Sequence, residues 1–359
     1  MSDISKIDKN FEVKSNAGRD DVVFKNSLET PFKIYGVFYQ DGKFRRIPEK
    51  VAETVSKGVL SLHANTAGGR LRFKTNSPYV AIYAELENIC RAPHFALTGA
   101  AGFDLYENID GEDRYINTFI PPYDVENSYE SVVDFFGEKE REITINFPLY
   151  TDVKNFYIGV SETSYIKAPE PYKYEKPIVY YGSSITQGGC AARPGTCYEA
   201  IISRRLSCDY INLGFSGVAR AEDEIANYIK DLDMSVFVYD YDHNAPTPEH
   251  LEKTHERMFK IIREKNPTLP IIMASKPKFH GDEYGENIYK LKRTLEIIQK
   301  TYNNAKAAGD ENVYFIHGGD LMQYARYDGT VDIAHPTDLG FYSMAKVFGD
   351  LIEKILKHQ

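Results

Sequence analysis

The apolar residues of this chain change their spacing at one proline-rich segment, and this change limits the possible folds more than any other feature. Between Pro31 and about Tyr165 they recur at every second position, and pairs such as Asp41-Gly42 separate the runs. Alternation of this kind is typical of strands with one buried face, and Asp-Gly pairs favour tight hairpin turns. The clearest runs are Val80-Ile82-Ala84-Leu86, Ile143-Ile145-Phe147 and Phe156-Ile158-Val160. We therefore expect an antiparallel β-sandwich domain over residues 31–167, preceded by a polar leader at residues 1–30.

Prolines mark the end of this pattern. Pro169, Pro171 and Pro177 disfavour both a helix and a central strand, so we place a domain linker at residues 168–176. Beyond it, short apolar runs alternate with helical segments, which implies right-handed crossovers between parallel strands. The predicted strands are Ile178–Gly182, Tyr210–Leu213, Val236–Tyr241, Pro270–Ala274 and Val313–His317. We expect residues 177–359 to form an α/β domain with a five-stranded parallel sheet flanked by helices.

Composition limits the classes of function. A net charge of −9 over 359 residues argues against a nucleic-acid partner, because a phosphate-binding surface needs clustered Lys and Arg. The amino terminus lacks the apolar core of a secretory signal and no stretch is long enough to span a membrane, so we expect a cytoplasmic protein without a membrane partner. The four cysteines are not spaced as a metal pair and are expected to be free thiols. We predict no metal and no cofactor. A homo-oligomer is compatible with the sequence.

The first strand of the α/β domain carries a candidate nucleophile. Pro177–Tyr181 is apolar throughout, as in a strand buried on both faces, and Gly182 permits a sharp turn before Ser183 and Ser184. Ser184 would then lie at the carboxyl end of the strand, where open α/β sheets form their ligand crevice. The structural alternative is that both serines only cap the next helix or make a turn. A hydroxyl needs a base beside it to act as a nucleophile, so partners elsewhere decide the question.

Polar residues after three other predicted strands could supply those partners. His335 can act as a general base, and Asp332, three residues earlier, can orient the imidazole. The N–H groups of Ser184 and Gly217 and the side chain of Asn244 could stabilise an oxyanion. Each residue also has a structural interpretation, since Asp332 and Asn244 are common turn formers and His335 could lie on the surface.

Four segments carry a resemblance to a known family. GSSIT, NLGFSG, DHNAP and DIAHP resemble the four sequence blocks of the SGNH hydrolases, the GDSL-like esterases and lipases. The resemblance implies a flavodoxin-like fold with Ser184 as nucleophile, Gly217 and Asn244 in the oxyanion hole, and His335 with Asp332 as base and orienter. The segment Gly102-Phe103-Asp104-Leu105-Tyr106 resembles the GxDLY signature of a β-rich domain that precedes some of these hydrolases. Two departures are Ser183 in place of the usual Asp of GDS, and Asp242-His243-Asn244-Ala245 in place of GxND.

The resemblance leads to an expected activity. Two-domain enzymes of this type include carbohydrate acetylesterases, so we expect removal of O-acetyl groups from oligosaccharides, or from another small ester, through an acyl-Ser184 intermediate. Arg193 and His280 are candidate substrate-binding residues. Arg193 could equally anchor its own loop, and His280 could be a structural histidine. An acyltransferase with the same residues, and a carbohydrate-binding protein without catalysis, are the alternative functions.

Overall fold

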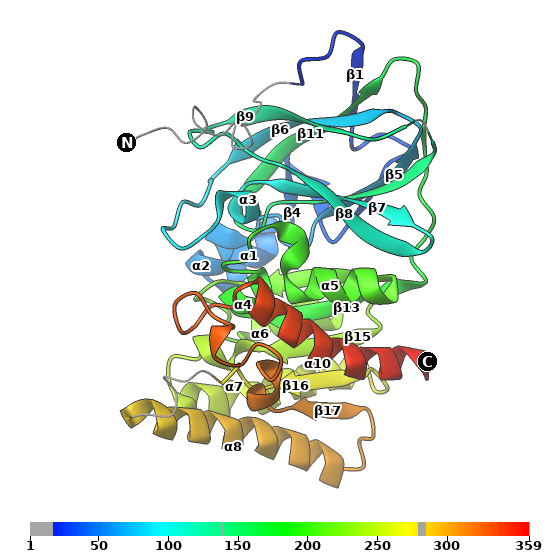
Figure 1. Ribbon diagram of the computed structural model, residues 1–359. Coiled ribbons are helices and arrows are strands. Elements are labelled where there is room, and N and C mark those ends of the chain that lie inside the picture. Colours follow the sequence, from blue (N-terminus) through cyan, green and yellow to red (C-terminus); the bar gives the residue numbers. More distant parts are fainter. Residues whose placement is uncertain (1–16, 138, 279–284, 359) are drawn as a thin grey trace.

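The computed structural model describes residues 17–137, 139–278 and 285–358, and shows a β-rich part stacked on an α/β part (Figure 1). Two antiparallel sheets face each other in the β-rich part, and one buried cluster contains side chains of both. The first sheet has the strand order β1 (Val22–Asn26), β11 (Asp152–Ser161), β6 (Tyr79–Glu87) and β9 (Ser128–Asp134). The second has the order β12 (Ile166–Lys167), β5 (Arg70–Thr75), β10 (Arg141–Asn146), β7 (Phe103–Ile109) and β8 (Glu112–Phe119), with β2 (Lys33–Tyr35) beside β5. This arrangement confirms the predicted antiparallel sandwich.

The alternating apolar runs supply the sandwich core. Val80, Ile82, Ile143, Ile145 and Ile158 are all fully buried. Short additions complete this part of the chain: the hairpin β3 (Phe38–Gln40) and β4 (Lys43–Arg45), and the helices α1 (Glu49–Val55), α2 (Lys57–Leu62) and α3 (Leu97–Ala100).

The sandwich begins earlier than the sequence indicates. Strand β1 lies inside the segment predicted as a polar leader, and Val22 pairs with Ser161 of β11. β1 is an edge strand whose residues are alternately half-buried and exposed, so its apolar signal is weak. Where the independently folding units begin and end stays a prediction.

The α/β part has the predicted five-stranded parallel sheet. Its strand order is β14 (Cys208–Gly214), β13 (Tyr174–Gly182), β15 (Val236–Asp240), β16 (Ile271–Ala274) and β17 (Val313–Ile316). Strand β13 starts at Tyr174, inside the segment predicted as a linker. A register shift between Tyr174 and Ile178 accommodates Pro177, which cannot donate a hydrogen bond to the sheet.

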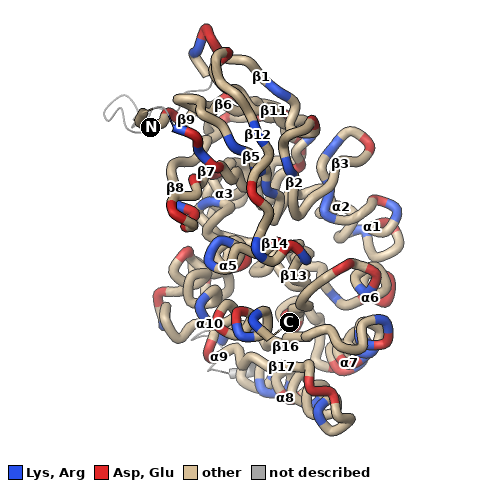
Figure 2. Tube along the Cα trace, turned by 90° about the vertical axis from the view of Figure 1, so that its right-hand side faces the viewer, with Lys and Arg blue, Asp and Glu red and all other residues tan. Residues whose placement is uncertain are grey.

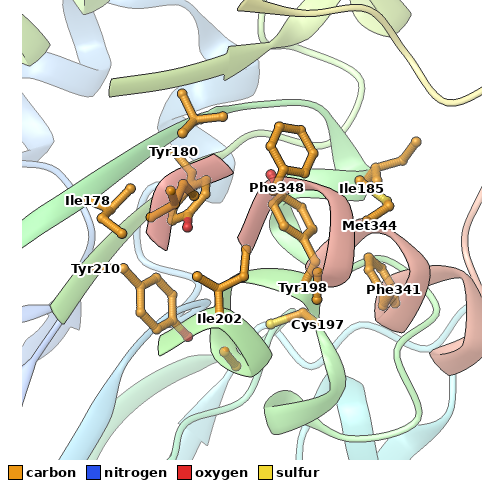
Figure 3. Close-up of a cluster of buried hydrophobic side chains, with 14 of the residues drawn as sticks. Ile178, Tyr180, Ile185, Cys197, Tyr198, Ile202, Tyr210, Phe341, Met344 and Phe348 are labelled. Carbon is orange, nitrogen blue, oxygen red and sulfur yellow. The ribbon is translucent and has the colours of Figure 1, made fainter. Parts of the chain in front are cut away.

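Helices cover both faces of this sheet. The longer ones are α5 (Tyr198–Leu206), α6 (Asp223–Lys230), α7 (Pro248–Lys265), α8 (Gly285–Ala307) and α10 (Asp338–Lys357), and the short ones are α4 (Ser184–Gln187) and α9 (Gly318–Leu321). Along β13, Ile178 and Tyr180 enter the core with α5 and α10, whereas Val179 and Tyr181 enter the core with α6, α7 and α8. Figure 3 shows the first core, in which the ring of Tyr198 contacts that of Tyr180 at a centroid distance of 5.6 Å.

Buried arginines join the two parts. Arg46, which follows β4, donates hydrogen bonds to the carbonyls of Asn212, at 3.3 Å, and Gly214 in β14. Arg70 of β5 pairs with Asp209 and donates to the Tyr210 carbonyl at 3.1 Å. The β-rich part is therefore tied to strand β14, next to the strand that carries Ser184.

The charges of the surface are mixed. Lys and Arg are interspersed with Asp and Glu in both parts of the chain (Figure 2). Among the described helices, none combines the length and the apolar character that are needed to cross a bilayer.

Candidate active site

The two serines after β13 have different roles in the structure. Ser183 is the N-cap of α4, and its Oγ accepts a hydrogen bond from the Ile185 N–H at 3.1 Å. Ser184 is the first residue of that helix, and its side chain faces the loop that carries His335. The turn needs a glycine at position 182, because a Cβ there would lie 2.0 Å from Asp240 Oδ1. Ser183 therefore caps the helix, whereas the hydroxyl of Ser184 is directed toward His335.

Ser184, His335 and Asp332 form a continuous hydrogen-bonded chain. Ser184 Oγ lies 2.9 Å from His335 Nε2, and His335 Nδ1 lies 2.8 Å from Asp332 Oδ2. Asp332 Oδ1 also accepts the backbone N–H of His335 at 2.7 Å. Partial burial would raise the pKa of Asp332, but the hydrogen bonds from His335 outweigh it and lower this pKa to about 2. Asp332 therefore stays ionised and holds the imidazole with Nε2 directed at the serine.

The turn between Asp332 and His335 is tight. Ile333 has a φ of 62°, in the left-handed region that L-residues rarely adopt. The sequence-predicted spacing of three residues therefore produces the contact through one unusual backbone conformation rather than through a helical turn.

The candidate oxyanion donors lie at the ends of three adjacent strands. The Ser184 N–H is at the start of α4, where a helix offers no internal acceptor. Gly217 has a φ of 74°, and among the described residues, its two chain neighbours aside, no atom lies within 4 Å of the position that a Cβ would occupy. One amide hydrogen of Asn244 is donated to the Phe215 carbonyl at 3.0 Å, which leaves the second available.

Hydrogen bonds join these three segments. Gln187 of α4 accepts the Ser216 N–H at 3.0 Å, and Asn244 is bonded to Phe215 in the same turn. The segments that carry Ser184, Gly217 and Asn244 are therefore held together as one unit.

A buried carboxyl group holds the helix that carries the nucleophile. Asp240 Oδ1, at the end of β15, accepts the hydroxyl of Thr186 in α4 at 2.7 Å. Burial raises the pKa of Asp240 to about 8, so this group is largely protonated at neutral pH. Asp240 was not among the residues predicted from the sequence, where the available signal was a carboxyl group at the end of an apolar central strand.

The β-rich part contributes a wall to the site. The ring of Phe95 packs on Tyr150 at a centroid distance of 4.7 Å and lies 6.3 Å from the ring of His335. The Tyr150 hydroxyl donates to the Ser184 carbonyl at 3.2 Å, and His94 Nε2 lies 3.8 Å from Asp332 Oδ2. The sequence carries no pattern that points to these residues, because the segments meet only in the folded chain.

Of the two predicted substrate-binding residues, Arg193 is placed by contacts with the β-rich part. Its guanidinium donates to Asp104 Oδ2 at 2.9 Å and to the Tyr106 hydroxyl, and lies 3.9 Å from the centre of the Tyr115 ring. These contacts favour the alternative interpretation, in which Arg193 anchors its own loop. His280 lies outside the described residues.

Comparison with known proteins gives this geometry a family. The GDSL-like lipase/acylhydrolase family matches residues 175–354. The chain belongs to this family. The GxDLY family, described as the N-terminus of SGNH-hydrolase-type esterases, matches residues 22–166 of this GDSL-like hydrolase. Both matches confirm the resemblance expected from the sequence motifs.

Solved structures agree with this assignment. A Bacteroides ovatus protein named for its likeness to GDSL lipases is 32% identical, with a TM-score of 0.85 over 94% of this chain and 98% of its own. A salicylyl-acyltransferase from a tetracycline biosynthetic pathway has a TM-score of 0.72 at 19% identity, over 91% and 96%. A family two carbohydrate esterase from Clostridium thermocellum, in complex with cellohexaose, has a TM-score of 0.59 at 15% identity, over 91% and 99%. A search of curated proteins found no match.

Proposed function

We propose that this GDSL-like hydrolase is a serine esterase in which Ser184 is the nucleophile. The observation that carries the proposal is the chain from Ser184 Oγ through His335 to Asp332, with contacts of 2.9 and 2.8 Å. A hydroxyl becomes a nucleophile when an oriented base accepts its proton, and this geometry provides the base and its orienter.

The first half of the reaction forms an acyl-enzyme. His335 Nε2 takes the proton of Ser184 while Ser184 Oγ attacks the ester carbonyl carbon. The resulting oxyanion accepts hydrogen bonds from the N–H groups of Ser184 and Gly217 and from Asn244 Nδ2. His335 then gives its proton to the leaving alkoxide as the C–O bond breaks. Asp332, whose pKa is about 2, stays negative and stabilises the imidazolium.

The second half releases the acid. Water gives a proton to His335 and attacks the acyl carbon of Ser184, and the same donors stabilise the second oxyanion. The bond to Ser184 Oγ breaks, and His335 returns the proton to that oxygen. The active site is then restored without a metal or cofactor taking part in any of these steps.

We propose O-acetylated oligosaccharides as the substrate class. The support is the similarity to family two carbohydrate esterases, one of them in complex with cellohexaose. The rings of Phe95 and Tyr150 beside His335 offer an apolar wall for a short acyl group.

An acyltransferase is the second candidate. A salicylyl-acyltransferase has the same fold with a TM-score of 0.72, higher than that of the carbohydrate esterase. Such an enzyme would use the same residues, with an acceptor hydroxyl in place of water at the second step.

One experiment separates these functions. NMR follows deacetylation across a panel of acetylated mono- and oligosaccharides, with and without an added acceptor alcohol, for the parent and the Ser184→Ala variant. We expect acetate release that requires Ser184. Transfer to the acceptor in preference to water would identify an acyltransferase, and Ser184→Ala with parental activity would refute the nucleophile assignment. A protein that binds the sugars but releases no acid would be a carbohydrate-binding protein.

A further inference from the structure

Three metal-ligating side chains meet at the edge of the candidate active site. They are His94, Cys190 and His335, and their ligand atoms all lie within 4.8 Å of one another. His94 comes from the β-rich part, between β6 and α3. Cys190 follows α4, the helix that begins with Ser184, and His335 precedes α10. The cluster therefore spans both parts of the chain and is assembled only when they pack together.

His335 has the hydrogen bonding that is typical of a metal-binding histidine. A histidine that binds a metal through one ring nitrogen almost always donates the other N–H to a carboxylate or carbonyl. His335 Nδ1 already makes this contact with Asp332 Oδ2 at 2.8 Å, which leaves Nε2 as the ligand atom. The Nε2 atom of His94 lies 3.8 Å from the same carboxylate oxygen. Because the His94 side chain is 38% exposed, a metal ion can reach it from solvent.

Two imidazoles and a thiol favour Zn²⁺ over hard cations such as Mg²⁺ or Ca²⁺, which prefer oxygen ligands. Zinc bonds of about 2.0 Å to nitrogen and about 2.3 Å to sulfur place tetrahedral ligand atoms roughly 3.5 Å apart. Closing the cluster from at most 4.8 Å to that size needs side-chain shifts of about 1 Å, to which the exposed His94 side chain can contribute. The fourth position would be open to water or to Ser184.

We propose that His94, Cys190 and His335 bind Zn²⁺ and that the bound ion inhibits the enzyme. On binding, the Cys190 thiol loses its proton to solvent as the Zn–S bond forms, with no change of oxidation state. The ion occupies the Nε2 lone pair of His335, which then cannot accept the proton of Ser184. The inhibition rests on the proposed role of His335 as base, whereas the metal site itself does not.

The test uses the full chain freed of metal with a chelator. Zn²⁺ is titrated while hydrolysis of an aryl acetate is followed, and Co²⁺ is titrated while the near-ultraviolet absorption is recorded. We expect inhibition that the chelator reverses, and a thiolate-to-cobalt charge-transfer band. Cys190→Ser should remove the band, and both Cys190→Ser and His94→Gln should raise the half-inhibitory Zn²⁺ concentration at least about 10-fold. These ratios compare each variant with and without metal, so a change of basal activity does not affect them.

Two controls make the result specific. Cys90 and Cys190 both lie near Tyr150, but Cys90 is not among the three ligands. Cys90→Ser should therefore keep both the inhibition and the band. Ser184→Ala should lose esterase activity but keep the band; a variant that stays active with the band intact refutes the proposed nucleophile and supports the metal site. The absence of a band in the parent, a band unchanged in Cys190→Ser, or equal inhibition of the parent and His94→Gln would overturn the proposal.

Discussion

The carboxylate of Asp104 accepts the backbone N–H of Gly195 at 2.8 Å, across the boundary between the β-rich part and the α/β part. The same oxygen accepts the Arg193 guanidinium, and the other carboxylate oxygen accepts Asn146 Nδ2 at 2.8 Å. From the opposite side, Asp338 at the start of α10 accepts the Ala192 N–H at 2.9 Å. The loop at residues 192–195, which follows α4, is thus held between two carboxylates. One of them, Asp104, is the Asp of the GxDLY motif.

Replacing this carboxylate should weaken the boundary. In Asp104→Ala the fully buried carboxylate is lost, and the Gly195 N–H and the Asn146 amide are left without their acceptor. A buried donor without a partner costs about 1–3 kcal/mol, so we expect a lower free energy of unfolding by at least that amount, together with reduced activity. Chemical denaturation measures the loss. Glu112→Gln, whose carboxylate is 78% exposed on strand β8, is the control and should change neither quantity. Equal stability of Asp104→Ala and the parent would show that this contact does not hold the loop.

The two neighbouring serines should separate stability from catalysis. Ser183→Ala removes the N-cap of α4, which is expected to lower stability by about 1 kcal/mol while the reacting hydroxyl remains. Ser184→Ala keeps the cap and removes the hydroxyl, so we expect a loss of turnover of about 10⁴-fold or more with little change in stability. Thermal unfolding and esterase kinetics on the two variants provide the comparison. The reverse pattern, with Ser183→Ala inactive and Ser184→Ala active, would contradict our assignment.

Asn244 should matter for the transition state more than for binding. Asn244→Ala removes an oxyanion donor, and the loss of one such donor typically lowers kcat about 10²- to 10³-fold. Because the donor acts on charge that develops during the reaction, we expect KM to change little. Steady-state kinetics measure both constants. Asn304→Ala is a matched control, since Asn304 is exposed on α8 and its amide donates to the half-buried carboxylate of Glu256 at 3.0 Å. A large change in KM with kcat retained would assign Asn244 to substrate binding instead.

The buried Asp240 should make stability depend on pH. Burial raises its pKa from 3.8 to about 8 in the folded chain. Between these values the folded state holds the proton and the unfolded state releases it, so stability should fall as pH rises from about 4 to about 8. Asp240→Asn imitates the protonated group and can still accept the Thr186 hydroxyl.

Denaturation of both proteins across this pH range tests the effect. Asp240→Asn should match the parent near pH 4 and exceed it above pH 8 by an amount on the order of a few kcal/mol. Asp233→Asn, whose carboxylate is 83% exposed, should follow the parent at every pH. Parallel curves for Asp240→Asn and the parent would show that Asp240 is ionised in the folded state.

Local patterns in the sequence determined the two architectures and the positions of the main candidate residues. Period-two runs such as that around Ile143 predicted half-buried strands, and apolar runs such as that before Gly182 predicted central parallel strands. Both predictions were possible because successive side chains of a strand point to opposite faces, so its own residues show which faces are buried. Parallel strands end at one edge of their sheet, so residues placed after those ends, including Ser184 and His335, could be expected to meet.

Tertiary structure alone decided what surrounds those residues. His94 and Phe95 reach His335 across the boundary that Arg70 and other residues hold together, and no local period encodes a contact between segments so far apart in the chain. The packing of the two parts turned Arg193 toward Asp104, and the packing within the α/β part buried Asp240 beside Thr186. The sequence therefore specified the candidate catalytic groups, whereas the aromatic wall beside them and the buried residues that support them came from the packing of segments far apart in the chain.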